Sequence, residues 1–160
     1  MSGSDCFIDA SGCMVCPATD GAPATPTRVI TSANLGWNAG ANSILKLDGD
    51  VHMVEAITAV PVDTYLGFKY ARANQTQPYR LAYAFRIYKL GTQASYELWE
   101  GTAQRVGANP YVLGTPLEIV RASGQVTYFV NGSLVYSSAV PSKGPLLVNA
   151  CLFSAGDTLP

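Results

Sequence analysis

The stretch QVTYFVNGSLVYSS, residues 125–138, is the part of the chain that decides the fold. Two runs rich in β-branched and aromatic residues flank the dipeptide Asn131–Gly132. A type I′ turn needs positive φ at both central residues, and Asn and Gly both tolerate it, so this stretch predicts a β-hairpin with a two-residue turn. Its register predicts two cross-strand pairs, Phe129 with Leu134 and Tyr128 with Val135. Both faces of the hairpin are largely apolar, so we expect one of them to meet the core.

Gly and Pro interrupt the rest of the chain so closely that the longest stretch free of both is the twelve residues 79–90. Because both residues break helices, a helix of ordinary length has almost no place to form. Residues 81–87 alternate between bulky side chains and Ala or Arg, which is the period of a strand. A helix is the alternative for this run, because Leu, Ala and Arg are good helix formers. Short β-rich runs predict the remaining strands at 44–47, 51–58, 64–70, 81–89, 95–100, 117–121 and 146–153.

These signals predict an all-β fold, a two-sheet antiparallel β-sandwich. The first 27 residues differ in composition. Three of the four cysteines lie in residues 1–16, and PATDGAPATPT, residues 17–27, has three prolines among small residues, as extended linkers do. We therefore predict an irregular N-terminal arm with a Pro-rich linker at 1–27 and a β-sandwich domain at 28–160. The first thirteen residues contain no Lys or Arg, so we expect no secretory signal.

Charge is scarce in this chain. Charged residues make up 13% of it, and its net charge is −1, whereas soluble domains carry about 25% charged residues. No basic run is present, so we expect no nucleic acid partner. No apolar run approaches about 18 residues, so we expect no membrane insertion. A surface with few charges is typical of a protein that partners partly cover.

The C-terminal half resembles a known module. GTPLEIVRASGQVTYFVNGSLVYSS followed by GPLLVNACLFSAGDTL resembles a recurrent concanavalin A-like β-sandwich found as a carbohydrate-binding-like domain in bacterial surface proteins and phage tail proteins. The resemblance covers roughly residues 85–160 and implies a jelly-roll sandwich. NLGWNAGANSIL and LDGDVHMV, which follow the cysteine-containing segment, resemble small tail-tip or baseplate proteins of long-tailed phages. Because this fold hosts lectins, structural modules and glycosidases alike, it does not by itself assign a function.

From this resemblance we expect a non-enzymatic structural component of a phage virion, assembled in the cytoplasm of the bacterial host. Its N-terminal arm would dock it at the tail tip or baseplate, since an extended arm can add a strand to another chain. The expected partners are other tail or baseplate proteins, copies of itself and a host surface polysaccharide. The first alternative is an independent carbohydrate-binding module of a bacterial surface protein. A more distant one is a tail hub protein that carries a metal or an iron–sulfur cluster.

Glycoside hydrolysis is the natural catalytic alternative, and it needs two carboxyl groups that converge on one bond. Glu97 and Glu100 are the one close glutamate pair in a predicted strand. Because they are three residues apart, a regular strand directs them to opposite faces. Asp48 and Asp50 fit a polar turn, with a weak calcium site as the alternative. The single histidine, His52, lacks the nucleophile and orienting acid that catalysis would need. We therefore expect no enzymatic activity.

The cysteines leave three readings open. Cys13 and Cys16 form a C-x2-C pair, Cys6 could add a third thiolate, and Cys151 could be a fourth ligand where the arm folds back onto the last strand. Zinc and iron–sulfur centres take four such ligands. The other two readings are free thiols in a reducing cytosol and disulfides formed after release from the cell. We expect no cofactor, with zinc or an iron–sulfur cluster on these thiolates as the alternative.

Aromatic residues in loops are the candidates for sugar binding. A flat ring on a loop stacks on a sugar face, and amide side chains supply hydrogen bonds. Trp37 lies in a loop rich in Gly and Asn, where packing at one end of the sandwich is the stronger interpretation and sugar stacking is the alternative. Trp99, in a predicted strand, is expected in the core or at an interface. The sequence therefore selects four carbohydrate-binding candidates, Trp37, Tyr79, Asn109 and Tyr111.

Overall fold

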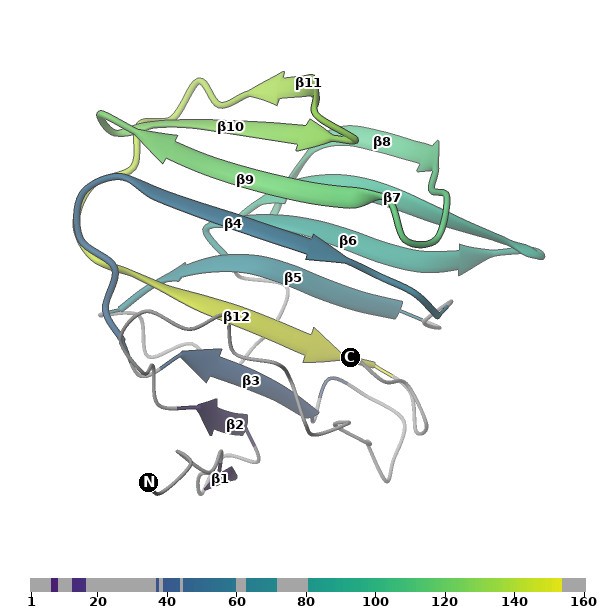
Figure 1. Ribbon diagram of the computed structural model, residues 1–160, viewed down its shortest axis with the longest axis horizontal. Helices are drawn as coiled ribbons and strands as arrows, with labels where there is room; N and C mark the ends of the chain where they lie inside the picture. Colours follow the sequence, from purple (N-terminus) through teal and green to yellow (C-terminus); the bar gives the residue numbers. More distant parts are fainter. Residues whose placement is uncertain are drawn as a thin grey trace.

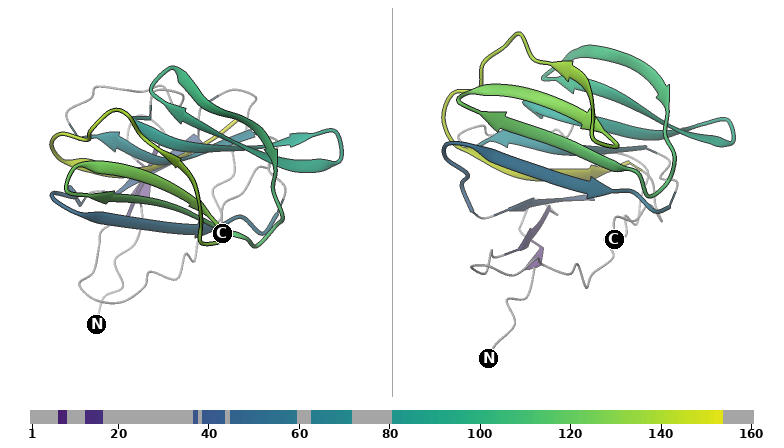
Figure 2. Two further views of the ribbon diagram at one scale, coloured as in Figure 1. Left: turned by 90° about the horizontal axis from the view of Figure 1, so that it is seen from above. Right: turned by 45° about the horizontal axis from the view of Figure 1, so that its top comes forward.

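The computed structural model describes residues 37, 43, 45–59, 63–71 and 81–153, together with the backbone of 7–8, 13–16 and 39–42. These residues form twelve strands and no helix, arranged as two facing sheets (Figures 1 and 2). This confirms the predicted two-sheet β-sandwich. Within residues 81–87, for which a helix was the alternative, residues 83–87 belong to strand β6 (Tyr83–Leu90). No helix in the described part of the chain is available to cross a membrane.

The large sheet has eight strands in the order β1-β2-β3-β12-β5-β6-β7-β8. Neighbouring strands are antiparallel except for β2 and β3, which are parallel. Two of the eight, β1 and β2, come from the predicted N-terminal arm. The bounds are β1 (Phe7–Ile8), β2 (Cys13–Cys16), β3 (Ala39–Ser43), β5 (Asp63–Tyr70), β6 (Tyr83–Leu90), β7 (Gln93–Glu100), β8 (Ala103–Pro110) and β12 (Leu146–Leu152).

The small sheet has four antiparallel strands in the order β11-β10-β9-β4. Their bounds are β4 (Val51–Ala56), β9 (Pro116–Ala122), β10 (Gln125–Val130) and β11 (Ser133–Ser137). The predicted turn joins β10 to β11, with φ of 53° at Asn131 and 71° at Gly132. These positive angles confirm the sequence-based prediction of the hairpin.

The register of this hairpin departs from the prediction at one pair. Phe129 faces Leu134 as expected, but a shift between Tyr128 and Phe129 places Tyr128 opposite Tyr136 rather than Val135. The shift corresponds to a β-bulge, which puts one extra residue on one strand. It brings the rings of Tyr128 and Tyr136 to 5.8 Å between centroids.

The core lies between the two sheets and follows the period of two along each strand. The large sheet contributes alternate residues of its central strands, such as Phe68, Phe85 and Leu98, and the small sheet contributes Ile119 and Tyr128. Each of these five side chains is at most 1% exposed. Burial of this apolar surface stabilises the sandwich at roughly 25 cal/mol per Å².

Two strand predictions need correction. The strand expected at 44–47 is replaced by β3, and Leu47 forms an isolated bridge to Leu146. Strand β8 was not predicted, because its sequence AQRVGANP is poor in β-branched and aromatic residues. It forms nevertheless, since the edge of β7 offers backbone partners along Ser95–Glu100. Tertiary pairing therefore overrides local propensity there.

Candidate ligand-binding face

The side of the large sheet that points away from the small sheet carries a dense group of polar and aromatic side chains, here called the outer face. Successive side chains of a strand point to opposite faces of the sheet. On β7, Leu98 packs in the core between the sheets, so its neighbours Glu97 and Trp99 point outward. Cross-strand pairing places Arg86 of β6 beside Glu97 and Tyr65 of β5 beside Arg86. The outer face comprises Trp37, Asp63, Tyr65, Arg86, Tyr88, Glu97 and Trp99.

Arg86 lies at the centre of the outer face. Its Nε donates to Asp63 Oδ1 at 2.9 Å and its Nη2 donates to Asp63 Oδ2 at 2.6 Å, which is a bidentate arginine–carboxylate pair. Its Nη1 donates to Glu97 Oε2 at 3.2 Å. The guanidinium carbon lies 4.6 Å from the centroid of the Tyr88 ring. The hydrogen bond with Asp63 is the main cause that raises the pKa of Arg86, so this site keeps a permanent cation between two carboxylates.

Glu97 accepts hydrogen bonds from three directions. Besides Arg86, the Tyr88 hydroxyl donates to Oε1 at 2.9 Å and the Trp99 indole donates from Nε1 to Oε2 at 2.8 Å. A buried carboxylate is costly unless it is paired and hydrogen-bonded, and this one has both kinds of partner. The network therefore fixes the orientation of the Trp99 ring and the Tyr88 ring relative to the sheet.

The aromatic rings of the outer face contact one another edge to face. The Trp37 ring lies 5.1 Å from that of Tyr65 and 5.1 Å from that of Phe153, and the Tyr65 and Trp99 rings lie 6.2 Å apart. Burial raises the pKa of Tyr65 to about 12, so its hydroxyl stays protonated at neutral pH. Trp37 and Trp99 are both half-buried, so each ring is partly accessible to solvent.

Of the four sequence-selected sugar-binding candidates, the structure brings Trp37 to the outer face. Asn109 is on β8, and its Nδ2 donates to the Gly107 carbonyl at 2.8 Å. Tyr111 is 5% exposed; its hydroxyl donates to the Thr115 carbonyl at 2.7 Å and accepts from the backbone N–H of Ile57 at 3.0 Å. Tyr111 therefore ties a loop to the end of β4 rather than presenting its ring to solvent. Tyr79 lies outside the described residues.

The cysteine positions that the structure describes lie on β2 and β12 of the large sheet. Gly40 of β3 pairs with Cys151 of β12 on one side and with Cys13 of β2 on the other. The backbone of β2 is therefore separated from the last strand, β12, by β3 alone. Cys151 is buried, and its Sγ donates to Asn149 Oδ1 at 3.1 Å. Among the described side chains no group of three or more His, Cys, Asp or Glu is placed to hold a metal; Cys6, and the side chains of Cys13 and Cys16, lie outside them.

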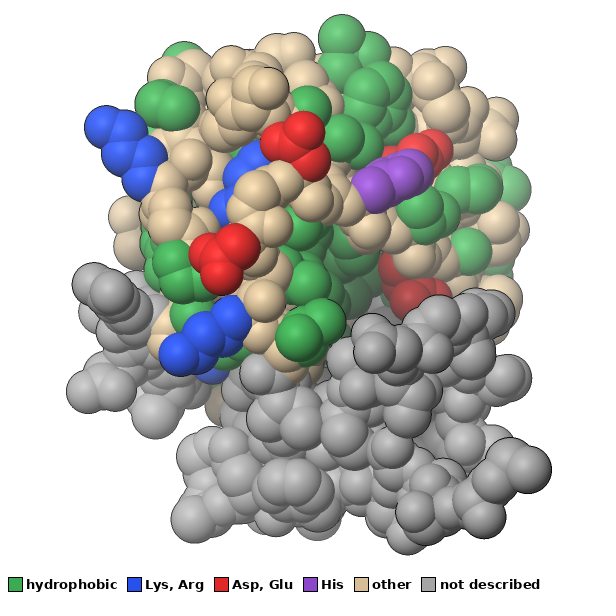
Figure 3. Space-filling view, turned by 60° about the vertical axis from the view of Figure 1, so that its left-hand side comes forward, with side chains coloured by type: hydrophobic (Ala, Val, Ile, Leu, Met, Phe, Trp, Pro, Cys, Tyr) green, Lys and Arg blue, Asp and Glu red, His purple; other side chains and the backbone are tan. Residues whose placement is uncertain are grey.

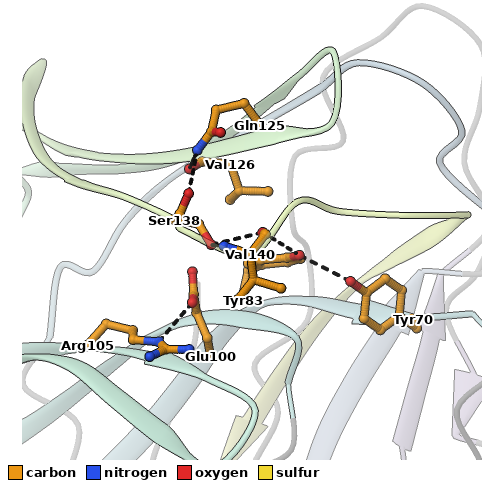
Figure 4. A network of polar contacts seen from close by, with 8 residues as sticks. All are labelled: Tyr70, Tyr83, Glu100, Arg105, Gln125, Val126, Ser138 and Val140. Carbon is orange, nitrogen blue, oxygen red and sulfur yellow. Dashed lines mark hydrogen bonds and ion pairs between the residues drawn. The ribbon is translucent and has the colours of Figure 1, made fainter.

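A second polar cluster lies between the sheets, where Glu100 points inward (Figure 4). Arg105 Nε donates to Glu100 Oε2 at 2.9 Å, while Glu100 Oε1 and the Tyr128 hydroxyl are buried without a hydrogen-bond partner. Burial is the main cause that raises the pKa of Tyr128, and the negative charge of Glu100 raises it further. The hydroxyls of Tyr70 and Tyr83 lie 3.1 Å apart beside this cluster.

The positions of the two glutamates bear on catalysis. Glu97 is on the outer face and Glu100 faces the interior, as their spacing predicted, so they do not converge on one bond. Asp63 and Glu97 share the outer face, but Arg86, Tyr88 and Trp99 donate to them, so both carboxylates act as acceptors.

Sequence reasoning missed the polar centre of the outer face, Asp63, Arg86 and Tyr88. One signal was present. Arg86 is at one of the even positions of residues 81–87, whose side chains alternate with the bulky ones, so this alternation predicts that Arg86 faces away from the core. Its partners could not be predicted, because they depend on how β5 and β7 align with β6.

Comparison with known proteins supports the fold. No family model and no curated protein matches the chain. Among solved structures, the TRIM65 PSpry domain matches with a TM-score of 0.52 at 15% identity, over 80% of this chain and 89% of that one. The Emp47p carbohydrate recognition domain matches with 0.43 at 8% identity, over 79% and 74%. The Bacillus licheniformis beta-glucanase matches with 0.40 at 14% identity, over 79% of this chain and 64% of that one. The first likeness supports the jelly-roll sandwich fold alone, because so few residues are identical.

Proposed function

We propose that this chain is a non-catalytic carbohydrate-binding β-sandwich that recognises a glycan on its outer face. One observation carries the proposal: partly exposed aromatic rings and oriented polar groups share one side of the large sheet. Sugar sites combine a ring that stacks on the apolar face of a pyranose with a few fixed hydrogen-bonding groups. Trp37 and Trp99 supply the rings, and Tyr88 and Arg86 supply fixed polar groups.

The absence of catalysis is part of the proposal. On the outer face the two carboxylates, Asp63 and Glu97, both accept hydrogen bonds from the arginine between them. This arrangement supports binding over hydrolysis, because a hydrolase must hold one carboxyl as a proton donor. The expected result is no release of reducing ends from any polysaccharide that binds. Turnover that is lost in Glu97→Gln would contradict a non-catalytic role.

The test of glycan recognition is a glycan array followed by calorimetric titration of the hits. Trp99→Ala removes both a ring and the indole that donates to Glu97, so we expect at least about a tenfold loss of affinity, which is about 1.4 kcal/mol. Leu134→Ala is the matched control, because Leu134 is 58% exposed and lies on the small sheet. A folded wild-type protein with no hits, or equal binding by both variants, would exclude the outer face as the site.

We also propose that the domain works in a phage virion, at the tail tip or baseplate, after assembly in the host cytoplasm. The sequence resemblance supports this setting. Strands β1 and β2 also support this setting, because they lie at one edge of the large sheet and are held there by backbone pairing. A segment that pairs in this way suits docking by strand addition. Deleting residues 1–27 should abolish incorporation into particles, whereas Trp99→Ala should be incorporated but bind host cells less. Incorporation of the deleted chain would contradict docking by the arm.

A further inference from the structure

Three loops meet at one end of the sandwich, and a buried arginine ties two of them together. Arg121 of β9 is 3% exposed. Its guanidinium donates to the carbonyls of Leu47, at 3.0 Å, and Gly49, at 2.6 Å, in the loop before β4. It also donates to the Gly144 carbonyl, at 2.9 Å, and to the Ser142 hydroxyl, at 3.3 Å, in the loop before β12. Because a buried cation is costly without such partners, these bonds fix both loops.

The third loop is the two-residue turn between β9 and β10, Ser123–Gly124, with φ of 50° and 81°. The Ser123 N–H donates to Asp50 Oδ1 at 2.6 Å, which ties the turn to the loop before β4. The Ser142 N–H donates to the Gly124 carbonyl at 2.7 Å, which ties it to the loop before β12. The surface between the three loops is therefore preorganised, and a ligand that binds there loses little affinity to ordering of the protein.

A hollow of about 290 Å³ opens between these loops, and this volume is close to the lower limit for pockets that hold small molecules, about 300 Å³. Its described walls are polar residues and glycines, which are Asp48, Gly49, Asp50, Arg121, Ser123, Gly124, Ser142 and Gly144. Figure 3 brings this end forward and shows acidic side chains set among uncharged side chains and backbone. Because none of the described walls is apolar, the hollow favours a ligand that binds through hydrogen bonds.

The walls also discriminate among polar ligands. Asp48 and Asp50, for which a calcium site was the alternative in the sequence, both line the hollow. Calcium takes about six to eight oxygen ligands, but Arg121 already holds the carbonyls of Gly49 and Gly144, and its positive charge opposes a metal ion. The two carboxylates in turn oppose an anion. A neutral ligand with several hydroxyl groups suits walls of both signs, because each hydroxyl both donates and accepts.

The conformation of Ser123 is an independent indication of a ligand. Asn, Asp and Gly are the preferred residues at the first central position of a type I′ turn, and the other such turn of this sheet has Asn131 there, with φ of 53°. Serine at positive φ is uncommon, and glycine would adopt this conformation without the steric cost. Strained positions of this kind gather at ligand-binding sites. What Ser123 adds over glycine is a hydroxyl at the wall of the hollow.

We propose that this hollow binds one ring of a neutral sugar, a pyranose, through Asp48, Asp50 and Ser123. The carboxylates accept hydrogen bonds from the sugar hydroxyls, and the Ser123 hydroxyl donates to one of them. Asp50 does so through Oδ2, since its Oδ1 accepts from the Ser123 N–H. The hollow shares no residue with the outer face, so it is a second site that binds whether or not the outer face recognises a glycan.

The test is an NMR titration of the ¹⁵N-labelled full chain with the methyl glycosides of glucose, mannose and galactose. We expect at least one of them to shift the amide signals of Gly49, Ser123 and Gly124 saturably. Calcium chloride, titrated separately, should leave these signals unchanged. Trp99→Ala, which alters the outer face, should keep the response. No response to any of the three sugars, a response to calcium alone, or loss of the response in Trp99→Ala would overturn the proposal.

Substitution of Ser123 separates binding from folding. Ser123→Gly relieves the positive φ, so it should melt no lower than the wild type, yet bind the sugar about fivefold more weakly because one hydrogen bond is lost. Asn131→Gly is the matched control, at the same turn position at the other end of β10, and should bind like the wild type. A Ser123→Gly variant with wild-type affinity, or an equal loss in Asn131→Gly, would contradict a sugar site in the hollow.

A second variant tests the carboxylate without disturbing the turn. Asp50→Asn keeps an oxygen for the Ser123 N–H but removes the negative charge that accepts from the sugar. We expect at least about tenfold weaker binding, since hydrogen bonds to charged groups are the stronger ones. Unchanged affinity in Asp50→Asn, with the fold intact by circular dichroism, would overturn the proposal.

Discussion

Arg86 of β6 donates two parallel hydrogen bonds to Asp63 of β5, at 2.9 and 2.6 Å, on the outer face of the large sheet. Their side chains are 27% and 15% exposed, so water screens the pair only in part. The same guanidinium also reaches Glu97 of β7. One cation therefore links three adjacent strands and holds two carboxylates that would otherwise repel each other.

Replacing Arg86 should therefore destabilise the fold. Arg86→Met leaves Asp63 and Glu97 without their cation, and we expect the free energy of unfolding to fall by about 2–3 kcal/mol in urea titrations, since breaking such a pair leaves poorly solvated charges. Lys89→Met, on the exposed end of the same strand, is the control and should change it by less than about 0.5 kcal/mol. Equal effects of the two substitutions would show that the network contributes no stability.

Removing the Tyr128 hydroxyl should have the opposite effect and raise the stability of the fold. It is fully buried and has no hydrogen-bond partner, so Tyr128→Phe removes a desolvated polar group and keeps the ring. We expect the free energy of unfolding to rise by about 1 kcal/mol. The control is Tyr83→Phe, which should lower it by about 1 kcal/mol because that hydroxyl contacts Tyr70 and donates to the Val140 carbonyl. Thermal and urea unfolding measure both; a loss of stability in Tyr128→Phe would contradict the orphaned hydroxyl.

Gly67 predicts a steric effect with a clean comparison. A Cβ at this buried position would lie 2.1 Å from the Tyr83 carbonyl oxygen, so Gly67→Ala must push β5 away from β6. We expect a loss of about 3 kcal/mol, the upper range for overpacking. At Gly107 of β8 nothing lies within 4 Å of an added Cβ, so Gly107→Ala should be tolerated. Similar melting temperatures for the two variants would argue against the close approach of the strands.

Glu55 predicts a pH dependence. Burial is the main cause that raises its pKa above the ordinary 4.5, so the folded state binds this proton more tightly than the unfolded state does. The free energy of unfolding therefore falls as pH rises from 4.5 through the raised pKa. Glu55→Gln removes this loss, so the variant should match the wild type below pH 4.5 and exceed it at neutral pH. Urea titrations at both pH values measure the difference; a constant offset would contradict the raised pKa.

How far the sequence predicts this fold depends on the element. The Asn131–Gly132 turn and the β-rich runs of β5, β6, β7, β9 and β10 are local signals, and the structure contains all of them close to the expected bounds. Strand β8 has no such signal and forms on the edge of β7. The outer face shows the same division: alternation predicts that Arg86 points away from the core, but the register of three strands decides that it meets Asp63 and Glu97.

By itself, the sequence determined that the chain folds as paired sheets of short strands and that Glu97 and Glu100 separate, because turn chemistry and the two-residue period act over a few neighbouring positions. Tertiary structure decided what lies beside what. It buried Tyr111 in a loop contact and gathered Trp37 with Tyr65. Those relationships depend on strand order and register, which join residues far apart in the chain and leave no local pattern.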